Sequence, residues 1–309
     1  MKGLKGALFI TLIGQLLCVG CKENALTPMS YGHAYEAIVV GDKDSMIYQL
    51  LSEPMVGLPQ SEPTFDVTMV SKANFKADSR LVRNVVIVEI DKQKHKAVNV
   101  SSRRNAYAAP QLILTIDAPS KEALHNFLIS NGKKLRNCLV KEELHRTQVH
   151  LAKHRNVEAE AKIRKLFGID IQVPVELQAS KEGKNFLWLS NNATSGVSNL
   201  CLYTINEGDF RQQRDSVMQR NILGERNNMY VQTSAIVSTS INKEVSTTIR
   251  GLWEMKNDAM GGPFVAYMRK HKPLLQRHIL VAEAFVYAPE SKKRNKLRAL
   301  EAALYTWKE

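Results

Sequence analysis

Side chains suited to binding a polar ligand gather in one stretch of the sequence, residues 250–262. Arg250 offers a guanidinium, Trp253 an aromatic face and Asp258 a carboxylate. Gly261 and Gly262 follow them, and paired glycines allow a positive φ or a close approach of the backbone to a ligand. A hairpin would fold the ends of this stretch together, so that the polar groups converge on one side. The pattern predicts the mouth of a binding cleft, and a tight hairpin turn is the alternative.

A second candidate is a single carboxylate in an otherwise apolar strand. Alternation over residues 279–287 places Glu283 on one face with Val281 and Phe285. A carboxylate covered by apolar neighbours needs a partner, and we expect Arg250 to supply it. Two interpretations stay open. The pair would fix strand register as a buried salt bridge, or Glu283 would be a cleft acid with a perturbed pKa.

Other reaction types have little support in the sequence. His150, His154 and Glu158 share a helix face at a spacing that suits zinc, but neighbouring cations favour an ordinary exposed polar face. There is no nucleophile elbow, phosphate loop or dinucleotide fingerprint. We therefore expect neither a metal nor another cofactor, assign no catalytic residue, and leave open whether the protein is an enzyme.

The N-terminal segment has the layout of an export signal. Lys2 and Lys5 precede an apolar run over residues 7–17, which ends before Gly20 and Cys21. That run is too short to cross a hydrocarbon core of about 30 Å. The segment resembles a bacterial lipoprotein signal peptide, which implies cleavage after Gly20 and a lipid on Cys21. An ordinary secretory signal with a chance cysteine is the alternative.

The charge balance bears on partners. Lys and Arg number 43 against 30 Asp and Glu, which gives a net charge of +13. Outside the cytoplasm, the anions that such a chain meets are lipid headgroups and phosphorylated glycans. The basic residues are scattered and lack interleaved aromatic residues, so we expect no nucleic acid. The expected partners are the membrane, through the lipid on Cys21, and an envelope protein or an anionic lipid or glycan.

The elements that position these residues follow from hydrophobic periodicity. A helical region is expected from about Pro119 to Phe167, broken at Gly132 and near Asn156 and closed by Gly168. Cys138 and Cys201 are expected to be small core residues, with a disulfide left open. Strands are expected at 36–40, 65–67, 84–90, 111–116, 169–173, 186–189, 200–205, 230–237, 246–255, 264–268 and 279–287, and further helices at 44–51, 208–221 and the C-terminal end.

Two strand-to-helix junctions look alike, at Ala118-Pro119 and Ala288-Pro289. They suggest two α+β units of ferredoxin-like type. We expect a signal peptide over 1–20, a tether over 21–30, a first unit over 31–168 and a second over 169–309, with one continuous domain as the alternative. The predicted fold class is α+β, with antiparallel or mixed sheets and helices on one face.

Several segments also carry a family resemblance, and they occur in order along the chain. The densest are 250–253, 258–264 and 285–290, and the others are 57–67, 83–88, 108–112, 180–190, 214–218 and 224–226. Together they resemble domain-of-unknown-function family 4837, found in cell-envelope lipoproteins of Bacteroidota. The resemblance transfers no activity and no catalytic residue.

These observations predict an exported, lipid-anchored envelope protein that acts in binding or in envelope assembly. The alternative is an envelope hydrolase that uses Glu283 and Asp258 as acids. We expect the outer membrane as its location. The periplasmic face is favoured over the cell surface because a single acid, Glu23, closely follows Cys21.

Overall fold

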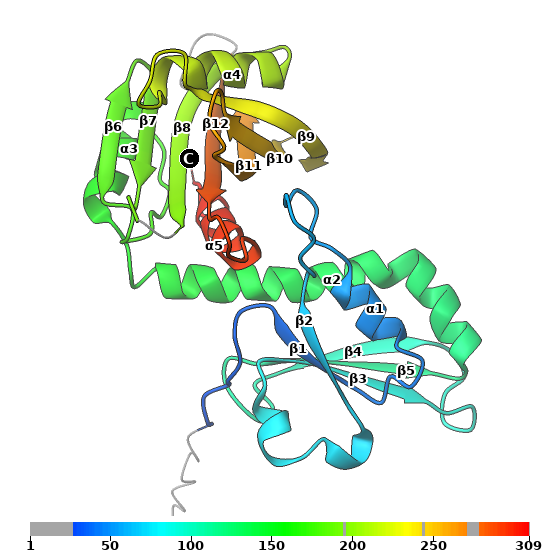
Figure 1. Cartoon of the computed structure of the whole chain (residues 1–309). Coiled ribbons are helices and arrows are strands. Elements are labelled where there is room, and N and C mark those ends of the chain that lie inside the picture. The colour runs from blue at the N-terminus through cyan, green and yellow to red at the C-terminus, as the bar shows by residue number, and fades with distance from the viewer. Residues whose placement is uncertain (1–26, 194–195, 243–244, 271–277, 309) are drawn as a thin grey trace, which may run out of the picture.

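The computed structural model describes residues 27–193, 196–242, 245–270 and 278–308, which form two units, each built on one sheet (Figure 1). The expected signal peptide and Cys21 lie outside the described residues. The predicted α+β class is confirmed, because strands and helices are both abundant and the sheets are antiparallel or mixed.

The first sheet is mostly parallel. Its strands are β1 (Glu36–Val40), β2 (Asp66–Val70), β3 (Asn84–Ile90), β4 (Asn99–Arg104) and β5 (Leu112–Ala118), in the order β2-β1-β3-β5-β4. Only β4 runs antiparallel to its neighbour, β5. The short helix α1 (Met46–Ser52) connects β1 to β2, and such a crossover makes the two strands parallel.

Helices cover one face of this sheet. Apolar residues of α1 and of the long helix α2 (Lys121–Leu151) pack on β1, β3 and β5. The other face holds a smaller apolar cluster, partly covered by the segment with the 3₁₀ turns Lys72–Asn74 and Ala77–Leu81. The expected helix break at Gly132 is wrong. A Cβ there would lie 2.9 Å from Leu50, so this glycine lets α1 pack closely against an unbroken α2.

The second sheet is antiparallel and larger. Helix α3 (Val157–Phe167) precedes it, beginning at the Asn156 cap and closed by Gly168 at a left-handed φ of 67°. The remaining elements are β6 (Ala179–Gly183), β7 (Phe186–Ser190), β8 (Val197–Asn206), α4 (Phe210–Asn221), β9 (Val231–Asn242), β10 (Ser246–Met255), β11 (Gly261–Lys270), β12 (His278–Tyr287) and α5 (Arg294–Leu304). The strand order is β6-β7-β8-β12-β11-β10-β9.

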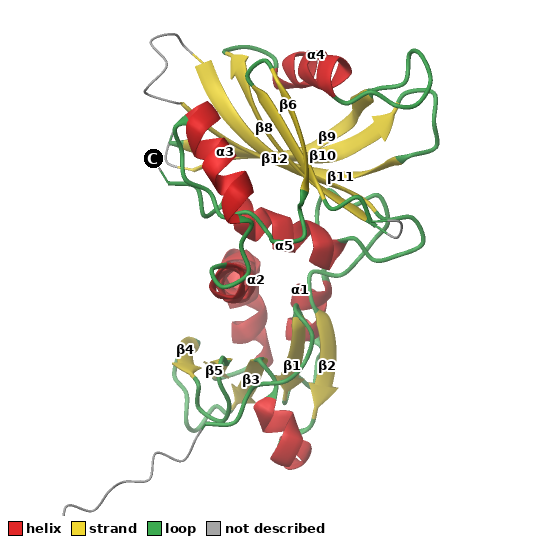
Figure 2. Ribbon diagram, turned by 90° about the vertical axis from the view of Figure 1, so that its left-hand side faces the viewer, coloured by secondary structure: helices red, strands yellow, loops and turns green. Residues whose placement is uncertain are grey.

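Helices lie on both faces of the second sheet, which corrects the expectation of one covered face. Helices α3 and α5 pack on one face and α4 on the other (Figure 2). Both faces of β8 and β12 are therefore buried, and alternate side chains of each strand enter two different cores.

The ferredoxin-like topology is also wrong. One unit has a mostly parallel sheet, and the other inserts β12 between β8 and β11. The similar Ala-Pro junctions mark strand ends and carry no information on strand order.

Two local expectations fail as well. Residues 169–173 form no strand, because they bond to the C-terminal segment at Lys308 and Thr306 instead of joining a sheet. Cys138 is exposed on α2, whereas Cys201 is buried as expected, and both thiols are free. Within the described residues, we find no helix with the length and apolar character needed to cross a membrane.

A candidate binding groove

A cavity of about 510 Å³, open to solvent, lies where residues 59–60 of the first unit approach the β10–β11 end of the second sheet. We call it the inter-unit groove. It is lined by Pro59, Gln60, Ser234, Leu252, Trp253, Glu254, Asp258, Ala259, Met260, Gly261, Gly262, Tyr287, Pro289, Glu290 and Lys293.

Four of the residues singled out in the sequence line this groove together: Trp253, Asp258, Gly261 and Gly262. The β10–β11 hairpin brings them together, because Trp253 is paired with Gly262 across the two strands. Its turn is closed by Met255 N–H donating to the Met260 carbonyl at 2.8 Å. The Asp258 carboxylate accepts from Met260 N–H at 3.0 Å. The stretch is thus both a tight hairpin and one wall of a groove.

Trp253 is a fixed wall of the groove. Its side chain is 3% exposed, and its Nε1–H donates to the Val286 carbonyl at 3.2 Å. The Phe285 and Tyr287 rings pack edge-on against it. Tyr287 is only half-buried and is therefore the more accessible aromatic surface for a ligand.

The two glycines allow the strands to pack closely. Neither has a positive φ. A Cβ at Gly262 would overlap the Val286 carbonyl oxygen on β12, and one at Gly261 would lie 2.9 Å from the Trp253 carbonyl oxygen. Backbone of the neighbouring strands therefore occupies the space that a side chain would need.

The groove is acidic in an otherwise basic protein. Glu254, Asp258 and Glu290 line it and are exposed. The one lining cation, Lys293, is mostly buried, and its Nζ donates to the Ser291 carbonyl at 3.0 Å. The arrangement favours a ligand that carries positive charge.

Helix α5 fixes the first-unit side of the groove. The Glu62 carboxylate accepts from the backbone N–H groups of Lys293 and Arg294, at 2.7 and 3.0 Å, where α5 begins. Arg294 in turn donates to the Pro63 carbonyl and to Asp66. Free N–H groups at a helix start attract a carboxylate. Sequence reasoning missed this contact, because nothing in the spacing links residues so far apart.

Arg250 lies away from the groove lining. It forms an ion pair with Glu301 of α5, which also accepts from Arg298 at 2.8 Å and from the Tyr305 hydroxyl at 2.6 Å. Burial by itself would raise the pKa of Glu301, but Arg250 and Arg298 outweigh burial and lower that pKa to about 2.

Glu283 is fully buried and paired, but its partner is Arg214 of α4, so the expected pair with Arg250 is wrong. In the sheet, Glu283 shares a row with Ala266 and Ile249. Arg250 is one residue further along β10, and a shift of one residue turns a side chain to the opposite face. Arg250 therefore contacts α5, whereas Glu283 contacts α4.

The Glu283 site is closed to solvent. Arg214 and Tyr203 donate to its carboxylate, and all three side chains are buried. Burial would lower the pKa of Arg214, but Glu283 beside it raises that pKa instead. A group that cannot meet a substrate is not a cleft acid. Glu283 therefore cannot serve as an acid in the hydrolase interpretation.

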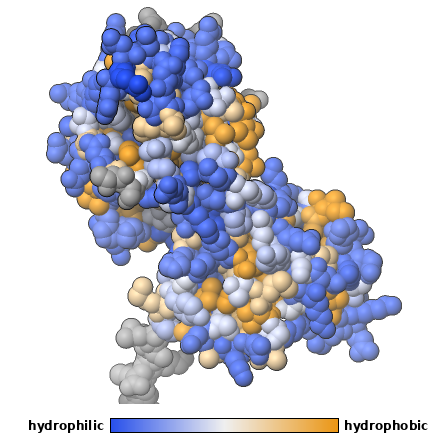
Figure 3. Space-filling view, viewed as in Figure 1, coloured by the Kyte–Doolittle hydropathy of each residue, from blue (hydrophilic) through white to orange (hydrophobic). Residues whose placement is uncertain are grey.

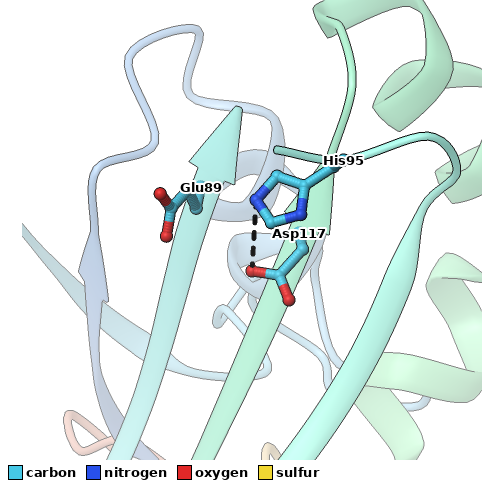
Figure 4. A group of neighbouring side chains, drawn as sticks. All are labelled: Glu89, His95 and Asp117. Carbon is cyan, nitrogen blue, oxygen red and sulfur yellow. Dashed lines mark ion pairs between the residues drawn. The ribbon is translucent and has the colours of Figure 1, made fainter. Parts of the chain in front are cut away.

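A further cluster, missed in the sequence, lies at the carboxyl ends of β3 and β5 (Figure 4). Ligand atoms of Glu89, His95 and Asp117 lie within 4.8 Å of one another. His95 Nε2 is 4.0 Å from Asp117, but Lys94 Nζ lies 2.8 Å from Glu89. Lys94 is also the main cause of the lowered pKa of Glu89. A lysine thus supplies the positive charge, and we assign no metal.

His150, His154 and Glu158 are exposed as expected, but they do not share a helix face, because α2 ends at Leu151 and Glu158 belongs to α3. The two imidazoles stack at 4.1 Å between centroids, and the carboxylate of Glu158 lies 3.5 Å from Lys162. This is an arrangement of surface residues and not of metal ligands.

The fold defines a two-unit α+β protein with a groove between its units. Residues 156–306 match the family described as Domain of unknown function (DUF4837), and residues 30–152 match Domain of unknown function (DUF8532). The two matches follow one another along the chain and correspond to its second and first units. The segments at 57–67, 83–88 and 108–112, which resemble family 4837, lie instead within the residues that match DUF8532.

No curated protein matches the sequence. Among solved structures, the Saccharomyces cerevisiae Ran-binding protein Mog1p is similar to part of the chain, with 9% identity and a TM-score of 0.28. The similarity covers 45% of this chain and 89% of Mog1p. At that TM-score it carries no argument.

Proposed function

We propose that this protein is an exported, lipid-anchored component of the cell envelope that binds a ligand in the inter-unit groove. The observation that carries the binding role is the groove itself, whose walls come from both units and are held together by Glu62 at the start of α5. A pre-formed concave site with a few polar groups is typical of ligand binding.

Export and anchoring rest on the sequence. Basic residues, a short apolar run and Gly20-Cys21 support cleavage before Cys21 and a lipid on its thiol. The resemblance to Bacteroidota lipoproteins supports the outer membrane as the location, with the periplasmic face favoured.

Binding is favoured over catalysis. Activation of a nucleophile requires a base within hydrogen-bond reach. The groove lining, taken over the described residues, contains one serine, Ser234, and no histidine or cysteine. The exposed carboxylates Glu254 and Asp258 are engaged by Gln232 and by the Met260 N–H group.

The groove surface indicates the class of ligand. Figure 3 shows a mainly hydrophilic face with separate apolar areas, so this face offers no single broad apolar docking surface. The groove instead combines three carboxylates with apolar surface from Tyr287, Met260 and Pro59. We propose a ligand with a cationic group beside an apolar portion, such as a basic segment of an envelope protein.

Site-specific photo-crosslinking in cells tests the proposal. A photoreactive side chain at Gln60 or at Glu290, which both line the groove, should give the same discrete adduct. The same group at the exposed Lys92 is the matched control. Adducts that are equal at all three positions, or absent from both groove positions, would contradict ligand binding in the groove.

A further inference from the structure

Two of the three acids of helix α2 are turned inward, and the third, Glu122 in the first turn, is exposed. Between Glu122 and Glu158, the acids are Glu142 and Glu143, and both are buried. Glu143 pairs with Arg83 and Arg146, and Glu142 pairs with Arg104 on β4. The negative charge of Glu142 and Glu143 is therefore neutralised inside the first unit.

The solvent side of the same region carries cations without acids. We call it the α2 cationic face, and it consists of Lys133, Lys134, Lys141, His145 and Lys153, all exposed. Lys134, Lys141 and His145 follow helical spacing and lie on one stripe. The four lysines form no ion pair with any residue in the described part of the chain. Exposed Ile129 and Val149 add apolar side chains to the same helix.

The start of the described chain is linked to α2 through Arg83. Arg83 N–H donates to the Tyr31 carbonyl at 3.2 Å, and Arg146 of α2 donates to the Arg83 carbonyl at 3.0 Å. Residues 29–31 are thus connected, through Arg83, to the buried side of the α2 turn whose exposed side carries Lys141 and His145. Figure 2 shows α2 at the outer edge of the narrow region between the two units, on the same side of the molecule as β4.

The short tether sets how far this face can lie from a membrane. Six residue steps separate Cys21 from Thr27, and an extended chain covers at most about 20 Å over that length. A lipid on Cys21 would therefore hold the start of the folded chain, and the adjoining part of α2, close to the headgroups.

We propose that the α2 cationic face docks on anionic phospholipid headgroups beside the lipid anchor. The inference rests on the proposed anchoring and adds an orientation to it. Lysines near an anionic surface are attracted to it individually, and the attraction falls off within a Debye length. Anchor and headgroup contact would together present the body of the protein to the membrane in one orientation.

Vesicle co-sedimentation tests this contact without the lipid. The chain from Lys22 onward keeps every described residue, so it reports on the protein surface alone. It should sediment with vesicles containing phosphatidylglycerol and not with pure phosphatidylcholine. Replacing Lys134, Lys141 and Lys153 with Glu should lower the partition coefficient at least tenfold, since three lysines correspond to roughly a hundredfold.

The matched control removes the same charge elsewhere. Lys43, Lys92 and Lys96 are exposed at the opposite, carboxyl-end edge of the first sheet, and their replacement with Glu should change partition less than twofold. Thermal unfolding of both variants checks that they are folded. An equal loss in the control variant, or no binding by the parent chain, would overturn the proposal. Failure of lipidation in cells would leave this result unchanged, so the two proposals fail separately.

Discussion

Arg214 and Glu283 form a bidentate ion pair in the core of the second unit. Arg214 Nη2 lies 2.6 Å from Glu283 Oε1, and Nε lies 3.0 Å from Oε2. The Arg214 guanidinium also lies 4.2 Å above the centre of the Phe264 ring, so packing holds it in place. The pair links α4 to β12 and so holds the helix against one face of the second sheet.

Removing one partner of this pair should be costly. Glu283→Ala leaves Arg214 charged and buried, and it should lower the free energy of unfolding by about 3–5 kcal/mol. The double change of Glu283→Leu with Arg214→Met should lower the free energy of unfolding by less than the sum of the losses for Glu283→Leu and Arg214→Met measured singly. Denaturant unfolding of all four chains measures the coupling. Arg250→Ala, on the opposite face, should be additive with Glu283→Ala within about 0.5 kcal/mol. Coupling with Arg250 would contradict the register.

The buried Glu301 should make stability depend on pH. Its pKa is about 2 in the folded chain, below the ordinary 4.5. The folded state therefore holds the proton more weakly than the unfolded state, and the stabilisation is full above pH 4.5 and lost as pH falls toward 2. Glu301→Gln should cost about 3 kcal/mol at pH 7, and that cost should shrink steadily between pH 5 and pH 2. Unfolding midpoints of both chains across this range test the expectation, and a pH-independent difference would contradict it.

The features that could be predicted from the sequence are those that depend on a residue and its neighbours along the chain. The strands over 84–90 and 246–255 were predicted with the bounds that the structure has, because both are long β-rich runs. Strands β4 and β6 were missed because they are exposed, polar edge strands without alternation. Glu283 was correctly predicted to be covered and paired. Its partner was not, because a one-residue offset in register decides which face Arg250 occupies.

In the groove, too, the local hairpin could be predicted from the sequence, whereas contacts between distant segments could not. Its β10–β11 wall could be predicted from 250–262, because a hairpin is a local structure. The opposite wall at Pro59 and Gln60 depends on Glu62 reaching the start of α5, and no sequence pattern encodes such a contact. The role of Gly262 also depends on β12, which is a neighbour in space and distant in sequence.

Gly262 should therefore be more sensitive than Gly261 to the addition of a methyl group. Gly262→Ala would force its Cβ into the Val286 carbonyl oxygen, and overpacking of this kind costs about 1–3 kcal/mol. Gly261→Ala is the matched comparison, since its nearest contact, the Trp253 carbonyl oxygen at 2.9 Å, is a milder overlap and requires a smaller backbone shift. Thermal and denaturant unfolding should show a clear loss for Gly262→Ala and a smaller one for Gly261→Ala. Equal stability of the two variants would contradict the close strand contact.

The anchoring proposal depends on one thiol and can be tested at that atom. Cys21→Ala should abolish incorporation of a labelled fatty acid, because lipoprotein maturation attaches lipid to the cysteine that follows the small residue. Cys18→Ala is the matched control: Leu17 before it is bulky, so Cys18 is a poor substrate and its loss should leave labelling intact. Labelling of immunoprecipitated protein, with the mass of the mature N-terminal peptide, gives the readout. If Cys21→Ala still incorporates lipid, or if only Cys18→Ala loses it, the assignment of the anchor to Cys21 is wrong. The reach of about 20 Å that places α2 at the membrane would then have to be drawn from a different residue.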